Sequence, residues 1–185
     1  MKAIELPLPE KVLAVDRALA EARIAHAFGG ALALAYYAEP RATIDIDVNA
    51  FVAPARHPDL AAALGPLGVA AETDPLAIER DGQTRWWWGR TPLDLFFAYD
   101  PFHDAMRKGV RRVPFGDNRI PIIAPEHLLV CKLAFDRAKD WLDIEQMLLV
   151  VDVLDLAEVE EWVRRLTGAG DPRWARLAEL LDRRR

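Results

Sequence analysis

Residues 26–48 have the sequence HAFGGALALAYYAEPRATIDIDV, in which a Gly-Gly turn and an Asp-x-Asp pair flank a short segment rich in alanine and leucine. The apolar run before Gly29 predicts a strand, the small residues after Gly30 predict a helix, and the β-branched run around Asp45 and Asp47 predicts a second strand. Because alternate side chains of a strand share a face, we expect Asp45 and Asp47 to project together while their neighbours face the core.

Both motifs suit a nucleoside triphosphate and its metal. Two carboxylates held side by side repel each other unless a cation lies between them, and Mg²⁺ typically takes one or two carboxylates and fills its other positions with phosphate oxygens and water. Glycine lets a phosphate approach the backbone closely, and the amides at the start of the next helix attract anions. Taken alone, the Gly-Gly motif is also consistent with a tight strand-to-helix turn that binds nothing, and the Asp-x-Asp motif with the polar edge of a strand.

A third carboxylate, Asp94, interrupts the apolar strand predicted over residues 92–97, PLDLFF. A buried carboxylate needs a metal or cationic neighbour, whereas an exposed edge position would need none. The preceding run of tryptophans, residues 86–88, should place Trp87 on one face of its strand and its neighbours on the other. Core packing is the default for this run, and a stacking platform for a base is the alternative.

Taken together, these motifs resemble the DNA-polymerase-β-type nucleotidyltransferase superfamily, and within it the small prokaryotic AbiEii-like toxin nucleotidyltransferases. The resemblance covers roughly residues 24–150. It depends on Gly29-Gly30, on RATIDID at 41–47, on LDL at 93–95, on PEHLLVCKL at 125–133 and on KDWLD at 139–143. One departure is Ala31, because the family often has a hydroxyl residue directly after the glycines or in place of the second one.

The resemblance implies an α/β (α+β) nucleotidyltransferase fold with a mixed β-sheet flanked by helices and a C-terminal helical part. We expect a nucleotidyltransferase core over residues 1–124 and a helical region packed on it over residues 125–185. Asp45 and Asp47 would bind two Mg²⁺ ions, with Asp94 on the ion beside the acceptor. The nucleotide would be bound by Gly29, Gly30, Arg41, Thr43, Lys132, Lys139, Asp140 and Asp143. A solvated helix face accounts equally well for the last four residues taken alone.

The implied reaction moves a nucleoside monophosphate from an NTP to a hydroxyl acceptor. By likeness to the AbiEii group, we expect a toxin that modifies tRNA or a protein and is held in check by a cognate antitoxin. The alternatives are an antibiotic-type enzyme that modifies a small molecule, and a catalytically silent nucleotide-binding or interaction module. The intact set of Asp45, Asp47 and Asp94 argues against the silent module, and Ala31 argues for it.

Composition sets outer bounds on these expectations. The chain has 185 residues, 52% of them hydrophobic, and a net charge of −5, which predicts one sizeable core and argues against broad nonspecific binding to nucleic acid. The sequence has no apolar run long enough to span a membrane, so we expect a cytoplasmic protein. The single cysteine, Cys131, is interpreted as a buried structural thiol.

Basic residues cluster at Arg107, Lys108, Arg111 and Arg112, and again at residues 183–185. We interpret both clusters as solvated surface, and the first is where the backbone of an RNA acceptor would bind.

Periodicity and turn residues predict further elements. Pro125 should begin a helix, and Lys132 and Lys139 align on it if it is continuous. Asp81-Gly82 predicts a hairpin turn. Helices are expected at 10–25, 29–39, 59–64, 156–166 and 172–181, and strands at 24–28, 43–52, 85–88, 91–99 and 120–123.

Overall fold

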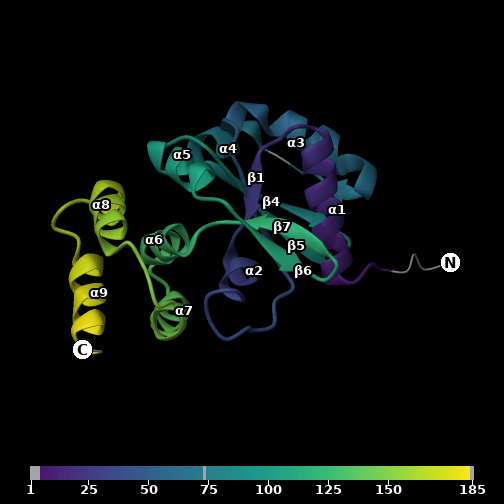
Figure 1. Cartoon of the computed structure of the whole chain (residues 1–185). Helices are drawn as coiled ribbons and strands as arrows, with labels where there is room; N and C mark the ends of the chain where they lie inside the picture. Colours follow the sequence, from purple (N-terminus) through teal and green to yellow (C-terminus); the bar gives the residue numbers. More distant parts are fainter. Residues whose placement is uncertain (1–4, 73, 184–185) are drawn as a thin grey trace.

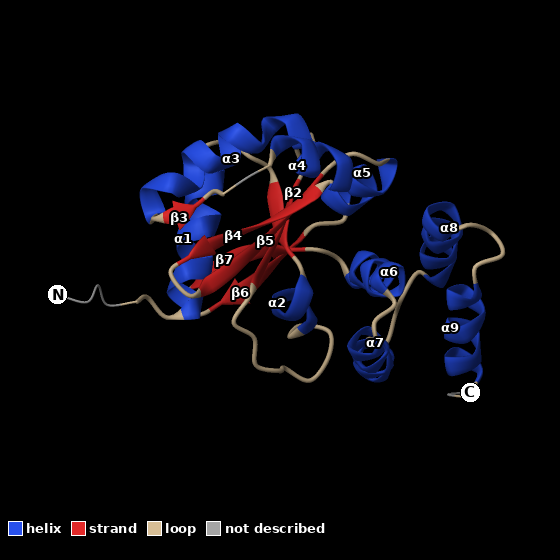
Figure 2. Ribbon diagram, turned by 180° about the vertical axis from the view of Figure 1, so that it is seen from behind, coloured by secondary structure: helices blue, strands red, loops and turns tan. Residues whose placement is uncertain are grey.

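The computed structural model describes residues 5–72 and 74–183, which form a seven-stranded mixed sheet with helices on both faces (Figures 1 and 2). The strand order is β3-β4-β5-β2-β1-β7-β6. The strands are β1 (His26–Phe28), β2 (Ile46–Ala50), β3 (Val69–Ala70), β4 (Gln83–Trp88), β5 (Thr91–Phe97), β6 (Arg111–Phe115) and β7 (Asn118–Ile122). The predicted α/β class with a mixed sheet is therefore confirmed.

The helices form two groups in the chain. The first comprises α1 (Leu8–Glu21), α2 (Gly30–Leu34), α3 (His57–Leu64), α4 (Pro75–Asp81) and α5 (Pro101–Lys108), with 3-10 turns η1 (Pro54–Arg56) and η2 (Gly65–Leu67). The second follows the last strand and comprises α6 (Pro125–Phe135), α7 (Ala138–Val150), α8 (Leu156–Thr167) and α9 (Pro172–Asp182). In Figure 1 this second group extends away from the sheet, on the side opposite the N-terminus.

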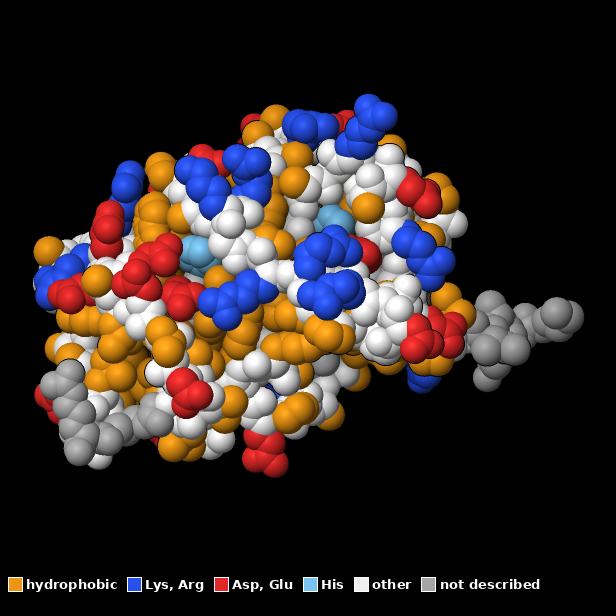
Figure 3. All heavy atoms as spheres, in the orientation of Figure 1, with side chains coloured by type: hydrophobic (Ala, Val, Ile, Leu, Met, Phe, Trp, Pro, Cys, Tyr) orange, Lys and Arg blue, Asp and Glu red, His pale blue; other side chains and the backbone are white. Residues whose placement is uncertain are grey.

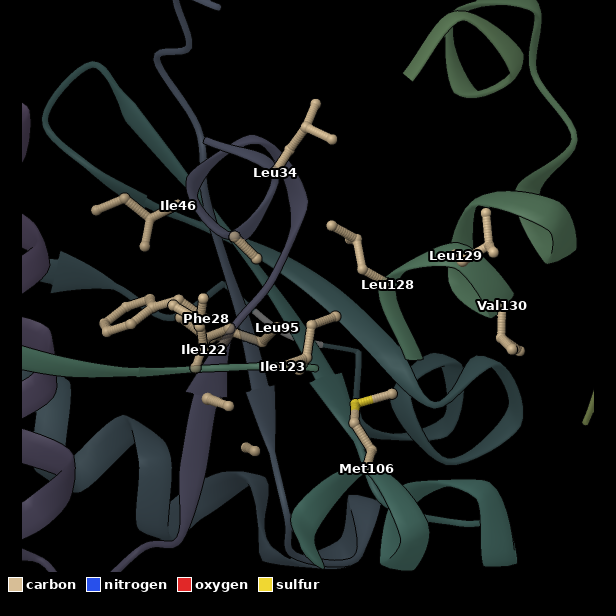
Figure 4. Close-up of a cluster of buried hydrophobic side chains, with 14 of the residues drawn as sticks. Phe28, Leu34, Ile46, Leu95, Met106, Ile122, Ile123, Leu128, Leu129 and Val130 are labelled. Atoms are coloured by element: carbon tan, nitrogen blue, oxygen red, sulfur yellow. The ribbon is translucent and has the colours of Figure 1, made fainter. Parts of the chain in front are cut away.

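The core connects the sheet to the first helix of the second group. Phe28 of β1, Leu95 of β5 and Ile122 of β7 are completely buried, and Leu128 and Leu129 of α6 are buried with them. Figure 4 shows Phe28, Leu95 and Ile122 grouped on the central strands, with Leu128 extending toward them from α6 and Leu129 further along that helix. Burial of this apolar surface fixes α6, and hence the charged residues that follow Leu129, against the carboxyl end of β1.

Pro125 begins a helix as predicted, but that helix ends at Phe135, because Asp136 takes a left-handed conformation with a φ of 53°. Lys132 and Lys139 were expected to align only if this helix is continuous, and that condition is not met: the two lysines lie on α6 and α7. This reversal of the chain still brings α7 back against α6.

Three further expectations need correction. Asp81-Gly82 is no hairpin turn: it ends α4, and Gly82 caps that helix with a φ of 64°. The strand expected at 43–52 is shorter, so that Asp45 lies directly before β2, and Ile44, expected to face the core, is 71% exposed. Strand β6 was not predicted, because it is a largely exposed edge strand that contains Pro114.

The basic cluster divides between the end of α5, which holds Arg107 and Lys108, and β6, which holds Arg111 and Arg112. Lysine and arginine side chains are spread over several parts of the face shown in Figure 3. In the second basic run, Arg184 and Arg185 lie outside the described residues. Within the described chain, no helix is long and apolar enough to cross a membrane.

Candidate active site

One row of side chains crosses three neighbouring strands in the middle of the sheet. Asp47 of β2 pairs with Asp94 of β5 in parallel register, and Asp94 pairs with Arg85 of β4 in antiparallel register. Paired residues on adjacent strands lie on the same face of a sheet, about 5 Å apart. The strand pairing therefore brings together two of the predicted carboxylates and adds a cation that was not predicted.

Arg85 holds both carboxylate oxygens of Asp94. Its Nε lies 2.6 Å from Oδ1, and its Nη2 lies 2.7 Å from Oδ2. The sequence contains a signal that would have found this pair: Gly89 and Arg90 form a two-residue hairpin loop, which sets Trp88 opposite Thr91 and therefore Arg85 opposite Asp94. Trp86 is fully buried and Trp87 is 45% exposed, as their alternation predicted.

The Gly-Gly turn packs directly on Asp47. The amide of Gly29 donates a hydrogen bond to the Asp47 carbonyl at 2.9 Å. Gly30 has a φ of +50°, and a Cβ there would lie 1.9 Å from Oδ2 of Asp47, while one at Gly29 would lie 2.8 Å from the side-chain nitrogen of Asn49. The glycines thus give space to the side chains of β2, and they also place the N-terminus of α2 beside the carboxylate.

Asp47 is electrostatically strained. Burial, followed by the nearby charges of Asp94 and Asp45, raises its pKa from 3.8 to about 6, although Lys132 and Lys139 act in the opposite direction. Asp45 lies at the entrance to β2, where its amide donates to the Thr43 hydroxyl at 3.2 Å. The Thr43 hydroxyl therefore helps to fix the turn into the strand.

The other predicted nucleotide-binding residues gather where α6 meets α7. Lys132 is buried, and its Nζ lies 2.5 Å from Asp143 and 3.7 Å from Asp140. Arg41 reaches the same Asp143 at 3.3 Å, and Arg137, which was not predicted, pairs with Asp140 at 2.6 Å. Lys139 is exposed and close enough to Asp47 to lower its pKa. One network of ion pairs thus joins Arg41, Lys132, Asp140 and Asp143.

A cleft of about 420 Å³ begins at Asp47, whereas Asp45, Asp94 and Arg85 do not line it. Part of its lining is charged or belongs to the glycine turn: Gly29, Gly30, Asp47, Lys132, Arg137 and Asp140. Another part is mainly aromatic and apolar: Phe96, Tyr99, Phe102, His103, Met106 and Phe135. Asn49, Phe96 and Gln83 form the next row of the sheet and line the cleft. Cys131 also lines it, and burial raises the pKa of its thiol to about 12, which suits a structural thiol rather than a nucleophile.

The side chains of the site carry the type of ligand atom that a divalent cation prefers. Asp47 and Asp94 are hard oxygen ligands on adjacent strands, and their mutual repulsion is the condition that a bound cation relieves. Among the described residues, however, no three histidine, cysteine, aspartate or glutamate side chains are arranged to hold a metal ion together. The predicted three-carboxylate set is therefore not assembled in this conformation, in which Asp94 faces Arg85.

The fold is shared with solved nucleotidyltransferase structures. The solution structure of the antibiotic-resistance factor ANT(2″)-Ia superposes with a TM-score of 0.62 at 16% identity, covering 95% of this chain and 96% of that one. The chain has a nucleotidyltransferase fold. A nucleotidyltransferase-like protein of Paracoccidioides brasiliensis gives a TM-score of 0.55 at 15% identity, over 95% of this chain and 92% of the other.

A crystal structure of ANT(2″)-Ia in complex with adenylyl-2″-tobramycin gives a TM-score of 0.54 at 16% identity, over 96% of this chain and 98% of the other. No protein-family model matches the sequence, and the curated proteins give no significant match. At these identities the likeness establishes the fold of the chain, and the roles of individual residues have to be argued from its own geometry.

Replacing Asp47 with Asn should stabilise the protein at neutral pH in the absence of metal. Because the folded state raises the pKa of Asp47 from 3.8 to about 6, the ionised form is disfavoured and the free energy of unfolding should fall as the pH rises through this range. Asp47→Asn cannot ionise, so we expect it to be more stable than the wild type by about 3 kcal/mol at pH 7 and about equally stable below pH 4. Urea unfolding at several pH values measures the difference. Parallel pH profiles for the two proteins would contradict the assignment.

Gly30→Ala should destabilise the protein by about 1–3 kcal/mol, because the new Cβ would collide with the Asp47 carboxylate. Gly116→Ala is the matched control, since Gly116 also has a positive φ, +56°, and a Cβ there meets no atom within 4 Å, so we expect only the backbone cost of about 1 kcal/mol. A double-mutant cycle isolates the contact: in an Asp47→Ala background the cost of Gly30→Ala should shrink. An equal cost in both backgrounds would show that only the backbone conformation of Gly30 matters.

Proposed function

We propose that the chain is a Mg²⁺-dependent nucleotidyltransferase that moves a nucleoside monophosphate from an NTP to a hydroxyl acceptor. The observation that carries the proposal is the pairing of Asp47 with Asp94 beside a Gly-Gly turn and at the edge of a cleft. Burial of the Asp47 carboxylate beside the charges of Asp94 and Asp45 raises its pKa to about 6, which argues for a ligand that compensates its charge.

In this proposal the carboxylates divide the work between nucleotide and acceptor. Asp45 and Asp47 hold two Mg²⁺ ions, and Asp94 joins them on the ion beside the acceptor. Bound Mg²⁺ supplies charge neutralisation at the phosphates and lowers the pKa of the acceptor hydroxyl. The raised pKa of Asp47 supports a bound cation at this carboxylate, because burial and the neighbouring charges of Asp94 and Asp45 disfavour its ionised form.

The charged part of the cleft lining suits the triphosphate. Gly29 and Gly30 bring the backbone and the first amides of α2 to the edge of the cleft, and Lys132 contributes positive charge from the opposite helix. Arg41, Asp140 and Asp143 hold Lys132 in place, Thr43 positions Asp45, and exposed Lys139 adds to the positive potential around Asp47.

The bonds exchanged in the reaction are simple. The acceptor oxygen forms a bond to the α-phosphorus of the NTP, the bond from that phosphorus to the bridging oxygen breaks, and pyrophosphate leaves with the bonding electrons. The proton of the acceptor hydroxyl passes to Asp94 or to solvent. The geometry needed is an acceptor oxygen in line with the leaving pyrophosphate, and in this proposal Asp94 would position that oxygen.

For the acceptor we propose a tRNA or a protein, in the context of a toxin restrained by an antitoxin. The resemblance to AbiEii-like enzymes supports this, and for RNA so does exposed Trp87, which lies one step beyond Arg85 on the same face of the sheet and offers a stacking surface. A small-molecule acceptor is the second candidate, favoured by the aromatic part of the lining of the 420 Å³ cleft. ANT(2″)-Ia, which shares the fold, was crystallised with adenylyl-2″-tobramycin.

Incubation with Mg²⁺, each labelled NTP in turn, and total tRNA, a cell lysate or a set of aminoglycosides separates these acceptors. Label in an RNA band, a protein band or a small-molecule spot identifies the class. Growth arrest on expression of the chain alone, relieved by a neighbouring gene product, would support the toxin. Absence of label from every fraction would favour the silent nucleotide-binding module.

Asp94→Asn should lose transfer but keep nucleotide binding. Its carboxylate acts on the acceptor, whereas the glycine turn and Asp47 hold the Mg-NTP, so we expect kcat to fall by about 100-fold or more while the Kd for a nonhydrolysable NTP changes little. Asp104→Asn, a change on the exposed face of α5, is the matched control and should leave both values unchanged. Calorimetry and a transfer assay measure the two quantities. Full transfer by Asp94→Asn would remove Asp94 from the reaction.

A further inference from the structure

The acceptor-side carboxylate is already occupied by a cation of the protein itself. Both oxygens of Asp94 accept charge-assisted hydrogen bonds from Arg85, at 2.6 and 2.7 Å. A divalent cation at the same oxygens would be placed beside a guanidinium, and the two positive charges repel each other. The two-point pair with Arg85 therefore competes with a metal ion for Asp94.

The side chain of Arg85 can move away from Asp94. Its side chain is 52% exposed, and among the described residues its only side-chain hydrogen-bonding partner is Asp94. By contrast, Lys132 is buried and is bonded to Asp143 and Asp140. The Arg85 pair can therefore open with a change of side-chain rotamer, without any movement of the sheet.

A phosphate group can replace the Asp94 carboxylate as the partner of the Arg85 guanidinium. Its planar array of donors binds a phosphate group in the same two-point manner as a carboxylate. Arg85 lies on the open face of the sheet, between the acid row and exposed Trp87, where a substrate phosphate arriving at the site would meet it.

We propose that Arg85 is a positioning residue that gates the metal site: it holds Asp94 in a closed pair and releases it when a substrate phosphate binds the guanidinium. This inference rests on the proposed nucleotidyl transfer. Its consequence is that the acceptor-side metal binds together with substrate. A protein without substrate would then not assemble the full metal set, which limits futile hydrolysis of the NTP.

Titration of the full chain with Mn²⁺, followed by electron paramagnetic resonance, tests the closed pair. Without substrate, Arg85→Met should bind Mn²⁺ at least tenfold more tightly than the wild type, and the gain should vanish in the double variant Arg85→Met/Asp94→Asn. Arg56→Met is the matched control, because Arg56 bonds Asp59 at 2.7 Å on an exposed surface, and it should behave as the wild type. Arg85→Lys, which keeps the charge but loses the two-point geometry, should fall between the wild type and Arg85→Met.

The release step has its own readout. The Nε–H resonance of Arg85, assigned by its loss in Arg85→Lys, should shift when a phosphate source is added without metal. A nonhydrolysable NTP and a short RNA oligonucleotide are the two arms, and the arm that shifts the resonance identifies which phosphate opens the pair. No shift in either arm would overturn the release step.

Failure of the gate and failure of the proposed function are distinguishable. If Arg85→Met and the wild type bind Mn²⁺ equally, and Asp47→Asn abolishes that binding, the metal site stands and the gate is overturned. If neither protein binds Mn²⁺ at all, the metal site and the gate are both overturned.

Discussion

The pairing of β2 with β5 is the constraint on which the site depends. It sets Asp47 opposite Asp94 in the interior of a sheet, where neither carboxylate is well hydrated, and it does so through backbone hydrogen bonds that side-chain repulsion cannot easily break. The rise in the pKa of Asp47 to about 6 is the measure of that conflict. The residues around the two carboxylates either accommodate them or offset their negative charge.

Three features respond to this concentration of negative charge. Gly30 leaves the space that the Asp47 carboxylate fills, Arg85 neutralises Asp94, and Lys132 adds positive charge from α6. The three features differ in how easily they can change position. Gly30 and Lys132 are built into packed elements, whereas Arg85 is a half-exposed side chain on the surface of the sheet. A substrate and its metal can therefore replace the last of these without disturbing the fold.

Much of the fold could be predicted from local sequence order. The Gly-Gly turn, the strand around Asp94 and the start of the helix at Pro125 lie where the sequence placed them, because each depends on residues close together in the chain. Of the Asp-x-Asp run, Asp47 lies in a strand as predicted, whereas Asp45 lies just before it. Helix α4 was missed although Asp74 and Pro75 form a good helix start, because Asp81-Gly82 was interpreted as a hairpin rather than as a helix end.

The parts of the site that escaped prediction depend on how segments meet. The register of the β4–β5 hairpin brings Arg85 to Asp94, and the left-handed turn at Asp136 folds α7 back so that Asp143 meets Lys132. The sequence motifs predicted that Lys132, Asp140 and Asp143 belong to one site, but not that Lys132 forms ion pairs with the two aspartates. Arg137 and Asn49 carried no motif, and their positions follow only from the packing around the cleft.

The most direct test of the central claim, that the Asp47–Asp94 row holds the catalytic metal, is a crystal structure with Mn²⁺ and a nonhydrolysable NTP. The anomalous signal of Mn²⁺ locates the ion independently of any assumption about its ligands. We predict an anomalous peak coordinated by Asp47, with the triphosphate between it and the Gly29-Gly30 turn. A triphosphate bound elsewhere in the protein, or an anomalous peak remote from both carboxylates, would contradict the account.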